Sequence, residues 1–393
     1  MNNKIVFAFI VLFALFQSRL VFAEFSPATI KAGGVDIVPV VEFSEFYDSN
    51  ILYSESATKN DLITRITPGV SASLASGANE YLLTAGALLE RFSKSKADNF
   101  IDTDIAVDLH QSITRKFILD VKAKRINAHE ERGLNYSRGL NTLAKPDAYA
   151  LNEAVVKLRY GGRESIGRMV FSIGNDSRVF NSRREITRFR DLENKRAGMT
   201  FYYHLMPKTS LLFELSQRKI DYRNNKADNS TEQRFFIGSR WDISALTSGT
   251  AKAGLLSKKF DDMAKSSVST FSWEIGARWS PLTYSVVDIV TKGLFEESDD
   301  INNYYIDSQS LLLKWVHFWA KNVDTTIHAN ALNRVYKQSG RNDKLKKIGI
   351  DINYHFRRWM DVGVGYNFAD SQSNISGYSY NKNVFFLSVK LGL

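Results

Sequence analysis

Apolar and non-apolar residues alternate along several stretches of the chain. In the stretch 347–356, which reads KIGIDINYHF, every second residue from Ile348 to Phe356 is apolar, and each residue between is charged, polar or small. The same alternation recurs at 101–110 and 271–279. Because successive side chains of a β-strand point to opposite faces, these stretches predict strands with one apolar face and one polar face.

Marking strands by this alternation divides most of the chain into strand-length segments. Beyond residue 23 no pattern with a period of 3.6 residues is sustained, so the sequence predicts an all-β protein. The expected strands span 35–47, 62–76, 80–93, 99–110, 115–131, 149–160, 166–178, 193–205, 209–222, 231–243, 250–260, 267–279, 284–296, 304–318, 324–336, 344–356, 360–368 and 378–391.

The connections between these strands alternate in length. Short turns such as 77–79 and 206–208 alternate with longer polar loops such as 48–61 and 132–148. Short turns at one rim and long loops at the other are typical of outer-membrane barrels. We therefore expect a closed transmembrane antiparallel β-barrel of about 18 strands, or of 16 as the alternative, with short periplasmic turns and longer extracellular loops. The apolar face of each strand would meet lipid and the polar face a wet lumen.

The tryptophans support a membrane-embedded barrel. Five of the six Trp residues fall at or near the expected short-turn ends of strands. Amphipathic rings favour the interface between membrane and water, whereas strand propensity alone explains only that aromatic residues are numerous. The expected aromatic girdle consists of Trp241, Trp279, Trp315, Trp319 and Trp359.

The first 23 residues have the composition of a secretory signal. Lys4 precedes an apolar run at 5–16, and Val21-Phe22-Ala23 precedes Glu24, which predicts cleavage after Ala23. The alternative, an N-terminal membrane anchor, is disfavoured because the apolar run is short. We expect a cleaved signal peptide at 1–23 and one barrel domain at 24–393, exported to the outer membrane of a Gram-negative cell.

The chain of 393 residues contains no cysteine and has a formal net charge of +10. Thiolate metal sites and cysteine nucleophiles are therefore excluded. Many basic residues share the parity of the polar face, and we expect them to line the lumen, where they would favour anionic solutes. In the alternative interpretation they pair with carboxylates of the wall. These residues are Lys122, Lys124, Lys157, Arg159, Arg168, Arg178, Arg218, Arg234, Arg240, Arg278 and Lys347.

Two loops carry clusters of charge. Basic residues gather at 183–196, either as a solvated loop, which we favour, or as a constriction or a contact for lipopolysaccharide phosphates. Acidic residues gather at 296–300, where a solvated tip is favoured over a Ca²⁺ site because the spacing matches no EF-hand. We expect no metal, no cofactor and no nucleic-acid partner.

The N-terminal third carries Val38-Pro39-Val40-Val41-Glu42-Phe43, then Tyr47-Asp48-Ser49-Asn50-Ile51, and then Ile66-Thr67-Pro68-Gly69-Val70. This order resembles the putative β-barrel porin type 2 family, whose members are outer-membrane proteins encoded with exopolysaccharide genes. The resemblance implies an outer-membrane channel with exopolysaccharide export as its context. Pro68 removes a backbone donor within an expected strand, which predicts a bulge or a late strand start.

These observations predict a porin that passes polar or anionic solutes. Its expected partners are outer-membrane lipids, lipopolysaccharide, anionic polysaccharide or small solutes, and the polysaccharide export machinery. The alternatives are a barrel with a structural or adhesive role and a barrel hydrolase, although the chain has no Gly-x-Ser-x-Gly, His-Glu-x-x-His or P-loop motif. His328 and Asn330 are expected to be luminal hydrogen-bonding residues rather than catalytic ones. A further alternative is a soluble exported β-propeller or sandwich that binds sugars. A propeller would repeat in blades of four strands, whereas the sequence shows alternating hairpins.

Overall fold

In the computed structural model, described for residues 25, 27–138, 143–162, 165–244, 246–298 and 303–392, the chain forms one antiparallel sheet that closes on itself. The expected signal peptide lies outside these residues. The strands are β1 Ile30–Ala32, β2 Val35–Asp48, β3 Asp61–Ser76, β4 Asn79–Phe92, β5 Phe100–Ser112, β6 Phe117–Glu130, β7 Asp147–Tyr160, β8 Gly167–Phe180, β9 Leu192–Met206, β10 Thr209–Tyr222, β11 Ser230–Ser244, β12 Thr247–Phe260, β13 Val268–Leu282, β14 Ser285–Glu296, β15 Tyr305–Ala320, β16 Val323–Lys337, β17 Asn342–Arg357, β18 Met360–Ser373 and β19 Tyr380–Gly392.

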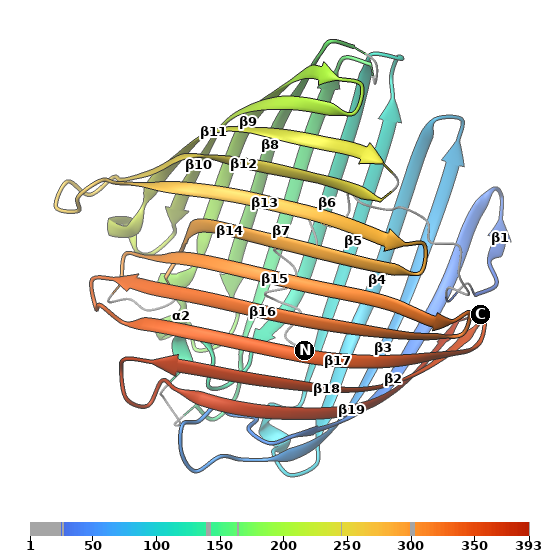
Figure 1. Cartoon of the computed structure of the whole chain (residues 1–393). Helices are drawn as coiled ribbons and strands as arrows, with labels where there is room; N and C mark the ends of the chain where they lie inside the picture. The colour runs from blue at the N-terminus through green and yellow to red at the C-terminus, as the bar shows by residue number, and fades with distance from the viewer. Residues whose placement is uncertain are drawn as a thin grey trace.

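Each strand from β2 to β19 pairs with its sequence neighbours, and β19 pairs with β2 to close the barrel (Figure 1). The prediction of an 18-stranded antiparallel barrel is confirmed. Closure leaves no strand of the barrel with a free edge, which the interior of a membrane requires. The remaining strand, β1, forms a short hairpin with β2 at the barrel edge, where Ala32 pairs with Val35.

The helices are short and lie in the loops. They are α2 Arg184–Thr187 and the 3-10 turns η1 Lys96–Asp98, η2 Asn135–Ser137, η3 Arg188–Arg190 and η4 Lys226–Asp228. No helix within the described residues is long and apolar enough to cross a membrane.

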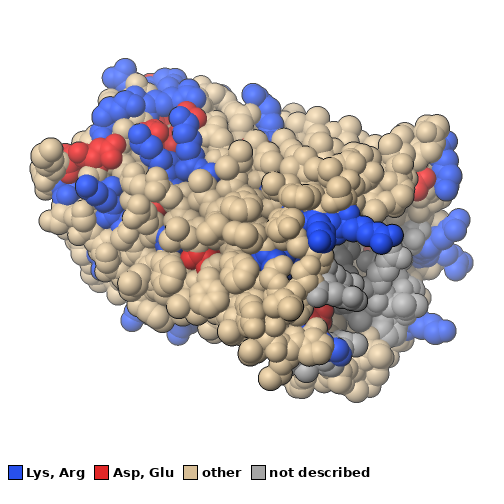
Figure 2. All heavy atoms as spheres, turned by 90° about the horizontal axis from the view of Figure 1, so that it is seen from above, with Lys and Arg blue, Asp and Glu red and all other residues tan. Residues whose placement is uncertain are grey.

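The alternating pattern determines which side chains face outward. On β17, Ile348, Ile350 and Ile352 are exposed by 52%, 40% and 45%, and they pair on the same face with Phe368, Tyr366 and Val364 of β18. The intervening Lys347 and Asp351 line a cavity on the other face. Figure 2, seen from above, shows that uncharged residues cover most of the middle of the visible face, and that Lys and Arg gather mainly toward its ends.

Two local expectations were wrong. Strand β3 starts at Asp61 and runs through Pro68, so the strand does not start late. Thr67 and Pro68 have no paired residue on β4, but Ile66 and Gly69 on either side pair in the same register, so there is no bulge either. The loop expected from Ala369 onward belongs to β18 as far as Ser373, because pairing to β17 and β19 continues where outward positions such as Asp370 are no longer apolar.

Candidate functional site in the barrel lumen

The pairing register places the eleven expected luminal basic residues on the inner face of the wall, because directly opposite residues of paired strands share a face. Lys122 pairs with Val155 and with Asp108, and Lys124 pairs with Glu153. The effect of the eleven basic residues on a passing solute remains a prediction, but the structure defines their contacts.

Five of these residues are held by carboxylates of the wall. The ion pairs are Lys122–Asp108 at 2.6 Å, Arg159–Asp120 at 2.8 Å, Arg218–Glu232 at 2.8 Å, Arg234–Glu274 at 3.3 Å and Arg278–Asp288 at 2.7 Å. For these five residues the alternative interpretation, pairing with carboxylates of the wall, is the correct one. Within the described residues, Lys157, Arg168, Arg240 and Lys347 form no ion pair. Arg178 packs over the ring of Phe180, 5.3 Å from its centroid.

Several of the ion pairs join into a network along the inner wall of β10–β13. Lys252 lies 2.7 Å from Glu214 and 2.8 Å from Glu274, and Glu274 contacts Arg234. At the long-loop end, Lys258 and Glu232 are fully buried and lie 3.3 Å apart. Burying one such charge without its partner costs free energy, so this network of ion pairs favours the observed spacing of the strands.

The acidic loop at 296–300 contributes to the same network of ion pairs. Glu297 turns inward and contacts Lys258 at 2.6 Å and Arg218 at 3.2 Å, so the expectation of a solvated tip was wrong for this residue. Glu296 pairs with Arg334 at 2.8 Å. Asp299 and Asp300 lie outside the described residues. In the part of the chain that the structure describes, no group of three or more His, Asp and Glu residues is placed to hold a metal ion.

The arginines of the basic loop at 183–196 form ion pairs with neighbouring carboxylates. Arg183 donates a 2.8 Å hydrogen bond to Asp147, and Arg184 binds Asp191 at 2.6 Å. These hydrogen bonds to carboxylates raise the pKa of both guanidinium groups. Arg190 is buried and binds Glu130 at 2.8 Å, so the favoured expectation was wrong for Arg190. Arg184 is paired but remains exposed.

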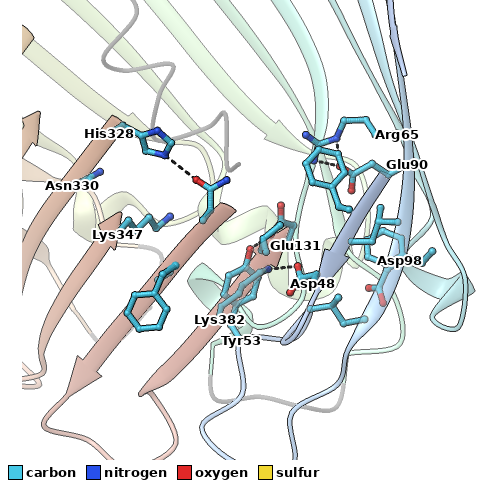
Figure 3. A pocket seen from close by; sticks show the side chains of 18 of the residues that line it. Asp48, Tyr53, Arg65, Glu90, Asp98, Glu131, His328, Asn330, Lys347 and Lys382 are labelled. Carbon is cyan, nitrogen blue, oxygen red and sulfur yellow. Dashed lines mark hydrogen bonds and ion pairs between the residues drawn. The ribbon is translucent and has the colours of Figure 1, made fainter. Parts of the chain in front are cut away.

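A cavity of about 440 Å³ lies inside the barrel below the long loops, within the size range of small-molecule sites. One side is formed by β2–β4, where Arg65 donates a 2.6 Å hydrogen bond to Glu90 beside the rings of Phe46 and Phe92. The other side is formed by β15–β18. Figure 3 shows His328, Asn330 and Lys347 on this side, facing Arg65 and Glu90 across the cavity.

The β15–β18 side of this cavity carries an excess of cations. Lys314 and Lys347 form no ion pair with any described residue, although Asp351 acts on Lys314 electrostatically. Asp351 lies 3.7 Å from His328, and the His328 Nε2 atom lies 2.9 Å from Asn367. His328 is therefore a luminal hydrogen-bonding residue, as the sequence predicted. Asn330 also lines the cavity, but its Oδ1 atom has no hydrogen-bond partner among the described residues.

Two loops cover the cavity on its outer side. In the loop between β2 and β3, Tyr53 packs on Tyr380 of β19 with ring centroids 5.1 Å apart, and its hydroxyl donates to Glu131 at the start of the β6–β7 loop. Burial, followed by the charges of Glu131 and Asp48, raises the pKa of Tyr53 well above its ordinary value. Gly133 lies so close to Leu52 that an added Cβ would sit 1.7 Å from the Leu52 carbonyl oxygen, so the two loops interlock here.

The β6–β7 loop, described at residues 131–138 and 143–146, also reaches the far wall. Arg138 donates to Asp343 of β17 at 2.9 Å, to Ser371 of β18 at 2.7 Å and to the Tyr378 carbonyl oxygen at 2.9 Å. On the other side, Arg132 binds Asp98 of η1, in the loop between β4 and β5, at 2.6 Å, and this hydrogen bond raises the pKa of Arg132. The loop thus bridges the outer part of the lumen.

Sequence reasoning did not identify Tyr53, Arg138, Lys314 or Lys382 as site residues. Lys382 contacts Asp48 at 2.6 Å and covers the Tyr53 ring at 3.9 Å. The available signal was the length of the loop at 132–148, because long loops in compact domains are often functional. Nothing in that loop indicates the wall strand to which it is bound.

The expected girdle tryptophans lie toward the short-turn rim. Trp279, Trp319 and Trp359 are exposed by 54%, 64% and 45%. Trp315 donates a 2.9 Å hydrogen bond to Ser285, and Trp241 packs against Gly249, where an added Cβ would meet its ring at 2.4 Å. A membrane interface at this level remains a prediction.

Comparison with known proteins gives one family. The family model described as Putative beta-barrel porin 2 matches residues 23–393. None of the curated proteins matches the sequence significantly.

Several solved structures share the fold at low sequence identity. Pseudomonas aeruginosa OccK1 (OpdK) matches with a TM-score of 0.51 and 11% identity, over 91% of this chain and 99% of that chain. OpdK with vanillate, from the same organism, has a TM-score of 0.50 at 11% identity over the same shares. OccK2 (OpdF) from P. aeruginosa has a TM-score of 0.50 and 9% identity, over 91% and 98% of the two chains.

Proposed function

Because the chain belongs to the Putative beta-barrel porin 2 family of outer-membrane barrels, we propose that this porin-like channel passes anionic solutes that also carry apolar surface, and that acidic saccharides of exopolysaccharide export are among them. The cavity between the loops and the wall carries this proposal. It combines two cations that have no ion pair among the described residues with an apolar side.

Charge and apolar surface are separated within the cavity. Phe46, Ile63 and Phe92 lie on the β2–β4 side, where Arg65 is already neutralised by Glu90. Lys314 and Lys347 lie on the opposite side with Asn330 and Asn367. A sugar acid offers a carboxylate to the cations, hydroxyls to the amides and a C–H face to the rings. A simple inorganic anion would use only the cations.

Planar-bilayer recordings of the purified barrel test this proposal. In a KCl gradient the reversal potential should indicate anion preference, and Lys314→Gln with Lys347→Gln should reduce that preference. Lys346→Gln is the matched control, because Lys346 is the neighbour of Lys347 on β17 but is exposed on the outer face. Galacturonate and vanillate are suitable first solutes. Absence of conductance, or equal selectivity in the double variant and the control, would reject the proposal.

One observation favours a second candidate function. The β6–β7 loop is bound to the β4–β5 loop through Arg132 and to the wall strand β17 through Arg138, which would suit a barrel that serves a structural or adhesive role with a closed lumen. Conductance separates the two candidates, since a closed barrel passes no ions.

A further inference from the structure

A second group of cations lies far from the loop-covered cavity, on the inner face near the short-turn rim. It consists of Lys157 and Arg159 on β7, Arg168 on β8, and Arg240 on β11; we call it the rim cluster. Each of these residues lies within a few residues of the short-turn end of its strand. This rim also carries the ends of β1 and β19, so it is the periplasmic side in the expected orientation.

Arg168 is held in position without a carboxylate. Its guanidinium lies over the ring of Tyr202, 4.5 Å from the centroid, and Tyr202 is its cross-strand partner on β9. Its Nε atom is buried and has no hydrogen-bond partner among the described residues. Besides Tyr202, the groups that act on Arg168 electrostatically are Arg240 and Arg159, both cations. Such a group is normally compensated, so this arrangement indicates a missing anion.

The carboxylates nearby do not compensate the rim cluster. Asp120 binds Arg159 through two hydrogen bonds of 2.8 and 3.0 Å and also lies 2.8 Å from His110. Arg240 has no hydrogen bond or ion pair with any residue that the structure describes, and Asp242, at the end of the same strand, is exposed. Among the described residues, Asp120 is thus the one carboxylate bound to the rim cluster, and Arg159 already engages it.

The spacing of the rim cluster indicates the kind of anion. Neighbouring strands lie about 4.8 Å apart, so the backbones carrying Arg168 on β8 and Arg240 on β11 are separated by three such steps, roughly 14 Å. A single carboxylate would contact one or two of these cations. A linear chain with a carboxylate on successive units would contact several, and arginine binds carboxylates bidentately.

From this arrangement we infer that the rim cluster is a binding site for a linear oligoanion, an acidic oligosaccharide that enters from the short-turn side of the barrel. The inference rests on the proposed passage of anions and deepens it, because it gives the solute a first contact at the periplasmic mouth. The loop-covered cavity would then be a later contact on the same path outward.

Calorimetric titration of the full-length barrel in detergent tests the inference independently of conduction. The probe is trigalacturonate, with monomeric galacturonate and neutral maltotriose as comparisons. Arg168→Gln with Arg240→Gln should weaken trigalacturonate binding by about tenfold, the order expected for losing charge-assisted contacts. Arg278→Gln is the control, because Arg278 lies near the same rim but is held by Asp288. Its effect should stay within about twofold.

Several outcomes would overturn the inference: wild-type affinity in the double variant, equal loss in the control, or equal affinity for galacturonate and trigalacturonate. Retention of the heat-stable folded band in gel electrophoresis excludes misfolding as the cause. In bilayers, trigalacturonate should block current more strongly from the short-turn side, and equal block from both sides contradicts the inference. A barrel that binds trigalacturonate through Arg168 and Arg240 but conducts no ions would reject the proposed function and leave the rim site standing.

Discussion

Arg138, in the loop between β6 and β7, donates a 2.9 Å hydrogen bond to Asp343 on β17, a residue 205 positions further along the chain. In the strand order of the barrel, β6 and β7 lie on the opposite side from β17. The contact therefore crosses the lumen, and both side chains are largely buried. The loop is bound to the wall by charge at the point where a solute would leave the cavity.

Removing the Arg138 side chain should release this loop and enlarge the path. Asp343 would keep a partner, because Arg341 contacts it at 3.0 Å. Arg138→Ala removes the hydrogen bonds to Asp343, Ser371 and the Tyr378 carbonyl, so it should lower stability by about 2–3 kcal/mol. We expect a larger and noisier single-channel current than in the unchanged protein. Arg183→Ala, which frees a loop that is bound to Asp147 nearby, is the control. An unchanged current in Arg138→Ala would mean that this loop does not limit passage.

The buried charges at Glu232 should be a major source of stability. Glu232 contacts Arg218 and Lys258, and both Glu232 and Lys258 have fully buried side chains. Glu232→Gln leaves the two cations with less compensation, and breaking a buried pair typically costs about 3–5 kcal/mol. Urea unfolding followed by tryptophan fluorescence measures this cost.

Glu153→Gln provides the comparison for Glu232→Gln. Glu153 also pairs with an arginine of the wall, but Arg196 has a second partner in Asp176 at 2.9 Å and both members of the Glu153 pair are partly exposed. The expected loss is below about 1 kcal/mol. Similar losses in the two variants would show that burial does not distinguish these pairs.

The period-two pattern was sufficient to predict the 18 barrel strands, because lipid on one side and water on the other require alternating apolar and polar side chains along each strand. The pattern failed at strand ends that extend beyond this apolar zone. Strand β18 continues to Ser373 by backbone pairing although Asp370 and Gln372 are polar, and β1 is too short to carry a pattern.

The loop-covered cavity could be predicted only in part. The parity of Lys347 indicates its inner face, but its neighbours Tyr53 and Lys382 come from a loop and from the last strand. Contacts such as Arg138 with Asp343 depend on barrel closure and loop conformation, and neither residue's local sequence encodes the other. For the same reason the sequence left the choice between free and paired wall cations open, whereas cross-strand register resolves it for Arg278 and Asp288.

Single-cysteine labelling of β17 should confirm its two faces directly, since the chain contains no cysteine. Cysteine at Ile348, Ile350 or Ile352 should react with a probe dissolved in the lipid phase, and cysteine at Asp351 or Asn353 with a water-soluble probe. Ile350→Arg should also cost about 2–4 kcal/mol if this position lies at the middle of the membrane. Equal access of the water-soluble probe to positions 350 and 351 would contradict a lipid-facing wall.

Alkaline pH should loosen the loops that cover the cavity. Burial and the nearby carboxylates Glu131 and Asp48 raise the pKa of Tyr53, so the folded state holds the phenol proton more tightly than the unfolded state. The stabilisation from this group is complete below the ordinary tyrosine pKa of about 10 and is lost as pH rises from there toward the folded-state pKa. Single-channel current should therefore increase above about pH 10. Tyr53→Phe keeps the ring packing on Tyr380 but removes the titrating hydroxyl, so this pH-dependent increase should be reduced. If the variant shows the same rise as the unchanged protein, Tyr53 does not control the loops.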